Sequence, residues 1–158
     1  MPNSLPRVGD VSPYFTLTSD ADEAITLSQY RGVANVVLYF YPKSDTPGCT
    51  LEACNFRDNY TALIEAGSVI LGVSPDPVKK QAKFVEKHAL PFPILADPDH
   101  SVAECYGLWK EKSFMGRKYM GVERTTFIID KEGVVREVFE KVKVAGHSEE
   151  VLAALKSL

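Results

Sequence analysis

The chain has 158 residues, of which 45% are hydrophobic and 25% are charged, and this is the composition of an ordinary globular protein. A chain of this length forms about one domain, which can bury roughly two thirds of its unfolded surface. The formal net charge of −3 and the absence of a lysine and arginine cluster argue against a nucleic-acid partner. No apolar run approaches the ~20 residues of a membrane-spanning helix. We therefore predict a single domain over residues 1–158 that does not enter a membrane.

The first residues of the chain, its cysteines and its histidines indicate where the protein is located and whether it binds a metal. Residues 1–7 lack the apolar core of a signal peptide, so we expect a cytoplasmic protein. Three cysteines are an odd number at uneven spacing, which argues against a structural disulfide framework and leaves chemistry or burial as their roles. The three histidines have no ligand spacing with any cysteine. No metal site and no cofactor are predicted.

The first part of the chain alternates between strand and helix patterns. Residues 8–17 are predicted to form an N-terminal β-hairpin or edge strand, with 25–27 as its return. The apolar run 35–41 is too short for a helix and predicts a central strand covered on both faces. Residues 47–66 have apolar side chains at helical spacing and end before Gly67, which predicts one long amphipathic helix.

A second strand and helix follow the first pair. The run 69–74 predicts another buried strand, and residues 77–88 predict a helix with Val78, Ala82 and Val85 on its inner face. The order strand, helix, strand, helix is typical of a parallel sheet.

The next segment has weaker patterns. Residues 92–95 predict a short strand next to prolines, and residues 99–108 predict a helix with Cys105 turned inward. The segment 110–121 is polar, contains two glycines and is predicted to be an exposed loop.

The last part of the chain predicts an antiparallel hairpin and a helix. Strands at 125–130 and 134–139 are separated by a short turn that contains Gly133. Ser148 is a favoured cap residue for a final helix. The complete pattern predicts an α/β protein with a thioredoxin-like fold, in which a mixed central sheet has helices on both faces.

The most informative stretch runs from Tyr39 to Cys54, where the predicted central strand leads into the predicted helix. Thr46 is a favoured N-cap residue, and Pro47 is the preferred type at the first helical position, which puts Cys49 at the third. Unpaired N–H groups and the helix dipole favour a negative charge there, and a thiolate would supply one. A lone cysteine is more often a small buried side chain. The carboxyl end of a strand is nevertheless where open α/β sheets place their sites, so we predict a reactive Cys49.

The segment 40–58 resembles the active-site segment of peroxiredoxins, and within them the group of peroxiredoxin Q and bacterioferritin comigratory proteins. The pattern Pro-x-x-x-Thr-x-x-Cys, formed by Pro42, Thr46 and Cys49, carries this resemblance. The similarity covers essentially the whole chain and extends to residues 9–10, 103–104, 119–127 and 130.

The resemblance implies a thiol-dependent peroxidase that reduces hydrogen peroxide and organic hydroperoxides. Cys49 would be the peroxidatic cysteine, and Cys54 would resolve its sulfenic acid as an intramolecular disulfide. Pro42 would shield the sulfur from water, Thr46 would hydrogen-bond the thiolate or the peroxide, and Arg124 would hold both. The expected reductant is thioredoxin or a glutaredoxin-type dithiol. An intramolecular resolving cysteine removes the need for a dimer, so a monomer is expected.

The spacing of the two cysteines adds a condition to this expectation. Residues five apart on a helix are separated by about 7.5 Å along the axis and by roughly 140° around it. This is farther than the ~7 Å between Cα atoms that a disulfide can span. A bond between Cys49 and Cys54 would therefore require the first helical turns to unwind. Two alternatives remain: Cys54 as a residue that only packs inward, and Cys105, predicted to be buried, as the minor candidate for resolution.

Two other functions remain as alternatives. A general thiol-disulfide oxidoreductase is disfavoured because the spacing of Cys49 and Cys54 excludes a C-x-x-C pair. A redox sensor or chaperone could use the same disulfide, but it would be oxidised once per molecule, whereas a peroxidase turns over.

Overall fold

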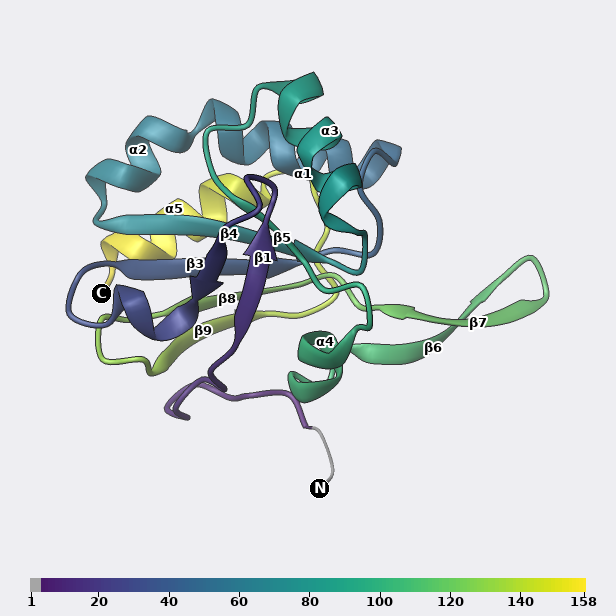
Figure 1. Ribbon diagram of the computed structural model, residues 1–158. Helices are drawn as coiled ribbons and strands as arrows, with labels where there is room; N and C mark the ends of the chain where they lie inside the picture. Colours follow the sequence, from purple (N-terminus) through teal and green to yellow (C-terminus); the bar gives the residue numbers. More distant parts are fainter. Residues whose placement is uncertain (1–3) are drawn as a thin grey trace.

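The computed structural model describes residues 4–158, which form a seven-stranded mixed sheet, a separate two-stranded ribbon and the helices around them (Figure 1). The strands are β1 Thr16–Ser19, β2 Ala24–Thr26, β3 Asn35–Phe40, β4 Ser68–Ser74, β5 Ile94–Ala96, β6 Trp109–Phe114, β7 Arg117–Val122, β8 Thr125–Ile129 and β9 Val135–Phe139. The helices are η1 Leu27–Tyr30, α1 Pro47–Asp58, α2 Tyr60–Glu65, α3 Val78–His88, α4 Ser101–Cys105 and α5 His147–Lys156. Within residues 4–158 no helix has the length and apolar character needed to cross a membrane.

The sheet has the order β2-β1-β5-β4-β3-β8-β9. Strands β3, β4 and β5 are parallel, and β1 and β8 pair antiparallel with this group from its two sides. Leu38 lies between Leu71 on β4 and Phe127 on β8, so β3 is central, as its continuous apolar sequence predicts. The predicted thioredoxin-like arrangement of a mixed sheet with helices on both faces is confirmed.

Alternate residues of the central strand point into two separate cores. Val37 and Tyr39 pack with side chains from α1, α2, α3 and α5, whereas Leu38 and Phe40 pack with η1, α4 and the segment before β1. Because successive side chains of a strand point to opposite faces, β3 organises both cores. The helix that carries Cys49 therefore packs against a strand that is buried on both faces.

The N-terminal hairpin is formed, but its position differs from the prediction. Its strands are β1 and β2, whose register pairs Thr16 with Thr26, and residues 8–15 contribute only an isolated bridge between Val11 and Val134. Leu27, predicted as part of the return strand, begins η1 instead.

The prediction of one helix over 47–66 is wrong, because the helix breaks at Asn59. This residue has φ −101° and ψ 11°, and its side-chain Nδ2 donates to Asn55 O at 3.1 Å and to Ser148 Oγ at 2.8 Å. An asparagine side chain that bonds to nearby backbone competes with the helix, and here it also ties the break to α5. The helix carrying Cys49 is thus limited to Pro47–Asp58.

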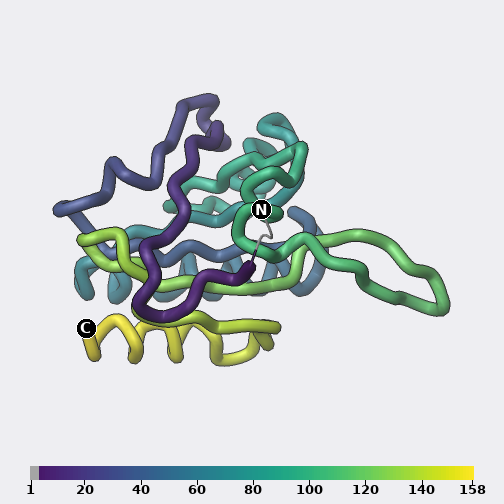
Figure 2. Tube along the Cα trace, turned by 90° about the horizontal axis from the view of Figure 1, so that it is seen from below, coloured from purple at the N-terminus to yellow at the C-terminus, as the bar shows by residue number. Residues whose placement is uncertain are grey.

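The prediction of a loop over 110–121 is also wrong. Strands β6 and β7 form a hairpin that projects from the body of the molecule, as Figures 1 and 2 show. Phe114 pairs with Arg117 across a two-residue turn, in which Met115 and Gly116 both have positive φ, 51° and 78°. Two positive φ values are typical of the type I′ turn that suits the twist of a hairpin. The pattern was missed because these strands have no buried apolar face.

The predicted inner face of α3 is only partly buried. On α3 the buried residues are Gln81 and Phe84, whereas Val78, Ala82 and Val85 are only partly buried. The side chain of Gln81 is satisfied inside the protein by hydrogen bonds.

The last helix begins two residues earlier than predicted, at His147 instead of the residue after Ser148. Gly146, with φ 76°, is its N-cap, and Ser148 lies inside the first turn. Ser148 instead accepts the hydrogen bond from Asn59.

Candidate active site

Cys49 lies where the sequence predicts it, at the third position of α1. Thr46 is the N-cap with extended backbone angles, φ −95° and ψ 156°, and Pro47 occupies the first helical position. The helix starts directly after the loop that leaves β3, so Cys49 sits at the carboxyl end of the central strand. Its side chain is 1% exposed.

Arg124 reaches Cys49 from a distant part of the chain. It lies between β7 and β8, 75 residues after the cysteine, and its Nη2 donates a hydrogen bond to Cys49 Sγ at 3.2 Å. Its Nη1 donates to Glu52 Oε1 at 2.6 Å. The guanidinium thus bridges a sulfur and a carboxylate while its side chain remains 17% exposed. A guanidinium in this place supplies charge-assisted donors beside the sulfur.

Glu52 belongs to the site although the sequence reasoning did not identify it. It follows Cys49 by three residues, so both share one face of α1, and its side chain is 1% exposed. Oε1 is bonded to Arg124, but Oε2 is buried without a hydrogen-bond partner. A glutamate on the apolar stripe formed by Ala53 and Phe56 was the signal that could have revealed it.

Burial has opposite consequences for the two members of this ion pair. It raises the pKa of Glu52 to about 7, against the opposing influence of the Arg124 charge and hydrogen bond. For Arg124 burial acts to lower the pKa, but the charges of Glu52 and Cys49 outweigh it and hold the pKa above its ordinary value. Burial therefore outweighs the ion pair in setting the pKa of Glu52 but not that of Arg124, because the carboxylate is almost completely enclosed and the guanidinium is partly exposed. Arg124 therefore keeps its charge, while Glu52 titrates near neutrality.

Thr46 and Pro42 lie in the same loop but do not contact the sulfur through hydrogen bonds. The Thr46 hydroxyl donates to Lys43 O at 2.8 Å and does not cap the helix. Pro42 is half-buried two residues after the end of β3. Of the sequence-predicted site residues, the structure thus brings Arg124 to Cys49 directly and keeps Thr46 on the loop beside it.

A buried polar network, which the sequence reasoning also missed, fixes this loop. Ser44 N donates to Asp76 Oδ2 at 2.7 Å, and Ser44 Oγ donates to Gln81 Oε1 at 2.6 Å. Tyr41 OH lies 2.7 Å from Ser44 Oγ, and Ser74 Oγ donates to Asp76 Oδ2 at 2.6 Å. All five residues are buried. Because buried polar groups are costly unless paired, this network holds the loop in one conformation against the start of α3.

Cys54 is on the same helix as Cys49 and is not joined to it. Both are free, and α1 is continuous over Pro47–Asp58, so the helical separation predicted from the spacing holds. Cys54 is half-buried and lies three residues before Arg57, whose Nη1 donates to His88 O at 2.7 Å. Residues three apart are neighbours on a helix surface, so Cys54 is on the side of α1 that faces the end of α3.

Cys105 was predicted to be buried, and this prediction is wrong. It is exposed at the end of α4, where Val102 and Ala103 fill the core instead. Since α4 packs against the opposite face of the sheet from α1, Cys105 is separated from Cys49 by the sheet. Among the residues that the structure describes, no three histidine, cysteine or acidic side chains gather as a set of metal ligands.

Comparisons with known proteins give one family. A family model described as the AhpC/TSA family matches residues 8–138. The peroxiredoxin Bcp of Bacillus subtilis (strain 168) is 49% identical over 152 residues, which are 96% of this chain and 96% of that protein.

Solved structures agree with this result. A Xylella fastidiosa PrxQ mutant superimposes with a TM-score of 0.90 at 34% identity over 96% of each chain. The bacterioferritin comigratory protein of Xanthomonas campestris superimposes with a TM-score of 0.85 at 39% identity over 90% of each chain, in a study of its alkyl peroxide reduction activity.

Proposed function

The chain belongs to the AhpC/TSA family and is a thiol-dependent peroxidase of the peroxiredoxin Bcp and Q type, and from this premise we propose that Cys49 is its peroxide-reducing nucleophile. The observation that carries the proposal is the contact between Arg124 Nη2 and Cys49 Sγ at 3.2 Å. A buried cysteine at a helix start, with a guanidinium bonded to its sulfur, has the surroundings of a reactive thiol.

In the proposed reaction the Cys49 thiolate attacks the terminal oxygen of a hydroperoxide. A sulfur–oxygen bond forms, the oxygen–oxygen bond breaks, and the leaving alkoxide or hydroxide takes up a proton as an alcohol or water. The sulfur loses two electrons and becomes a sulfenic acid. A low thiol pKa alone does not explain a fast reaction, because nucleophilicity falls with it. Donors aimed at the breaking bond must also contribute.

Arg124 is the main donor in this proposal. Its two terminal nitrogens point to different acceptors, so Nη2 can stabilise charge on the sulfur and on the peroxide oxygens while Nη1 stays bonded to Glu52. Glu52 is then a positioning residue that acts through Arg124. Thr46 would turn its hydroxyl from Lys43 O toward the bound peroxide, and Pro42 would limit access of water.

Cys54 would complete the cycle as the resolving cysteine. Its thiol displaces the hydroxyl of the sulfenic acid on Cys49, which gives a disulfide and water. Since the two positions are too far apart on a continuous helix, the first turns of α1 must unwind for this step. The break at Asn59 confines this change to Pro47–Asp58, because α2 starts a new helix.

The proposal also covers the reductant, the oligomeric state and the cellular location of the enzyme. Thioredoxin or a glutaredoxin-type dithiol would reduce the disulfide and return both thiols. A resolving cysteine within the chain is consistent with a monomer. An odd number of cysteines at uneven spacing is consistent with the reducing conditions of the cytoplasm.

A substitution with a mass-spectrometric measurement tests the proposal. We expect Cys49→Ser to abolish peroxide consumption in the presence of thioredoxin, thioredoxin reductase and NADPH. In the wild-type protein treated with one equivalent of peroxide, peptide mapping should join Cys49 to Cys54. Unchanged peroxide consumption by Cys49→Ser would refute the role of Cys49, and a bond to Cys105 instead would refute that of Cys54.

A further inference from the structure

Basic residues are concentrated in two segments of an otherwise acidic chain. Helix α3 has four lysines and one glutamate, and the segment 109–124, which contains the β6–β7 ribbon, has five basic and two acidic residues. Together these segments hold nine of the chain's 18 basic residues but only three of its 21 acidic residues. The rest of the protein is therefore strongly acidic, and the positive charge is local.

Both basic segments border the loop and helix that carry Cys49. Lys87 of α3 forms an ion pair at 3.1 Å with Asp45, which lies in the loop before α1. In the ribbon, Lys112 donates to Val122 O. The ribbon ends at Val122, two residues before Arg124, whose Nη2 donates to Cys49 Sγ at 3.2 Å. The two positive segments thus flank the proposed active site.

The side chains of the ribbon are sorted between its two faces. Cross-strand partners share a face, and Lys112 pairs with Tyr119 while Phe114 pairs with Arg117. Lys110 is on this same face by alternation and pairs at 2.5 Å with Glu123, which follows β7; within β6 and β7 themselves the face has basic and aromatic side chains. Phe114 is 67% exposed. Exposed aromatic residues beside arginine are typical of protein interfaces.

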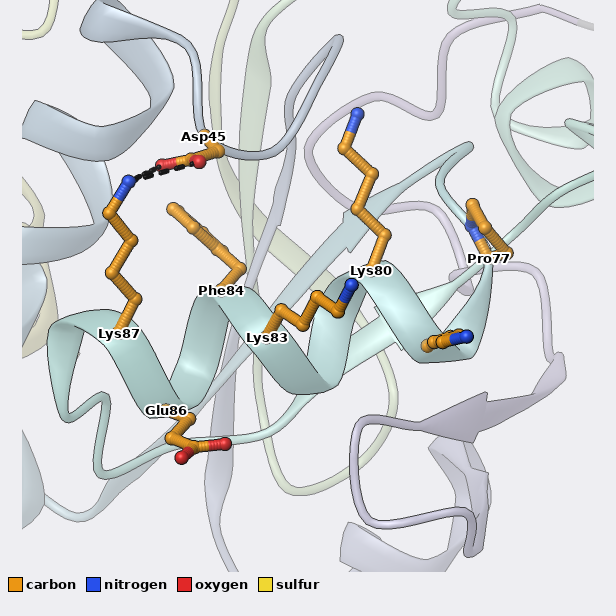
Figure 3. A pocket seen from close by; sticks show the side chains of 8 residues that line it. Asp45, Pro77, Lys80, Lys83, Phe84, Glu86 and Lys87 are labelled. Atoms are coloured by element: carbon orange, nitrogen blue, oxygen red, sulfur yellow. Dashed lines mark hydrogen bonds and ion pairs between the residues drawn. The ribbon is translucent and has the colours of Figure 1, made fainter.

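The α3 segment contributes a groove beside the site. The groove has a volume of about 900 Å³ and runs from Asp45 along the helix. Figure 3 shows Phe84 lying between Lys87 and Lys83, with Lys80 farther along the same groove. Within residues 4–158 Lys79, Lys83 and Arg117 form no ion pair, in contrast to Lys87 and Lys80, which pair with acidic groups of the protein itself. Their charges are free for a partner.

We propose that α3 and the basic face of the ribbon form a docking surface for a small acidic protein dithiol, which reduces the oxidised site between them. This inference rests on the proposed function, since it identifies the kind of reductant that the cycle needs. The partner's acidic rim would meet Lys79, Lys83 and Arg117. Its thiol would approach the Cys49–Cys54 disulfide from between the two basic segments. Nucleic acid also matches a basic and aromatic surface, but this surface surrounds a disulfide that must be reached by a dithiol in every cycle.

Reduction of the disulfide needs no reactant other than the two proteins. A thiolate of the reductant attacks one sulfur of the Cys49–Cys54 disulfide, which forms a mixed disulfide and releases the other cysteine. The second thiol of the reductant then displaces the remaining cysteine. Two electrons pass to the peroxidase, and the reductant leaves as its own disulfide.

The test compares a charged protein reductant with a small neutral one on the same oxidised enzyme. The wild-type protein is converted to its disulfide with one equivalent of peroxide and then reduced by a thioredoxin of negative net charge or by dithiothreitol. We expect Lys79→Glu/Lys83→Glu and Arg117→Glu each to slow reduction by thioredoxin about tenfold at low salt. The wild-type rate with thioredoxin should fall as salt shortens the range of the charges. Reduction by dithiothreitol and the single-turnover reaction with hydrogen peroxide should not change.

The matched control reverses two exposed lysines away from the site. Lys131 lies in the turn after β8, at the opposite end of the sheet because β8 runs antiparallel to β3, and Lys156 lies at the end of α5. Lys131→Glu/Lys156→Glu should leave the thioredoxin rate unchanged. An equal effect of this control, or no effect of the α3 and ribbon variants, overturns the docking surface. So does tight binding of an oligonucleotide with reduction unaffected. Failure of the proposed function would instead show as a wild-type protein that does not react with peroxide.

Discussion

Glu52→Gln is the most informative substitution, because it removes one charge from the centre of the site with almost no change of volume. In the wild-type protein Glu52 is buried, bonded through Oε1 to Arg124 at 2.6 Å, and unsatisfied at Oε2. The amide can still accept the hydrogen bond from Arg124, but it never carries a charge. The variant therefore separates the charge of Glu52 from its shape.

The expected effect on stability follows from the pKa of Glu52, which burial raises from 4.5 to about 7. The unfolded chain loses this proton near pH 4.5, whereas the folded protein keeps it until about pH 7. Between these values the folded state binds more protons, so the free energy of unfolding falls as pH rises. At 1.36 kcal/mol per pKa unit the fall is at most about 3 kcal/mol, and it is complete above the folded pKa. Glu52→Gln has no such titration and should lack this fall.

The expected effect on catalysis has the opposite dependence on pH. Above pH 7 the carboxylate holds Arg124 with a charge-assisted bond, and replacing it by a neutral acceptor should cost about 1–1.5 kcal/mol, or roughly tenfold in the rate with peroxide. Below the pKa of Glu52 the wild-type side chain is itself neutral, so the two rates should converge. The ratio of the rates removes any titration that both proteins share.

Urea unfolding and stopped-flow peroxide reduction between about pH 4 and pH 8 would measure both effects. Glu52→Asp should restore part of the alkaline rate. A difference in unfolding free energy that does not vary with pH, together with a constant rate ratio, would falsify the assignment of Glu52 as a titrating positioning residue.

Three further predictions concern other parts of the structure. Arg124→Ala should slow single-turnover peroxide reduction by a factor of about 10² to 10³, on the order seen for removal of one transition-state donor. Arg124→Lys should recover only part of this rate. An unchanged rate in Arg124→Ala would exclude Arg124 from the reaction. Gly72→Ala should destabilise the protein by about 1–3 kcal/mol in urea unfolding, because the added Cβ would lie 2.7 Å from Ile94 and 2.8 Å from the Tyr39 ring. Oxidation should raise amide exchange in α1, Pro47–Asp58, and leave β3 protected, whereas identical exchange in both redox states would argue against unwinding of the helix.

The sequence alone was sufficient for the elements whose patterns are strong and local. Strand β3 is a continuous apolar run between turn residues, and such a run can be stable only when covered on both faces. The start of α1 is equally local, because Pro47 suits the first helical position directly after the extended Thr46, even though the Thr46 hydroxyl bonds to Lys43 O and not to the helix. This is why the position of Cys49 was predicted to the residue.

The elements that were missed depend on contacts that a local pattern does not contain. Asn59, where the helix breaks, bonds to Ser148, which is 89 residues away, and the ribbon β6–β7 is stabilised by pairing between strands that bury almost nothing. Cys105 shares its helix with apolar residues, yet the short α4 turns it to solvent.

The same division applies to the site. Sequence determined the strand, the helix start, the position of Cys49 at that start and the family pattern around it, because these are set by neighbours within a few residues. Only the tertiary structure decided that Arg124 bonds to both Cys49 and Glu52, that a buried network fixes Ser44, and that Lys87 of α3 pairs with Asp45 in the loop before α1. The physical reason is that charges interact through space, so residues 75 positions apart can share one site only after the sheet brings β3 and β8 together.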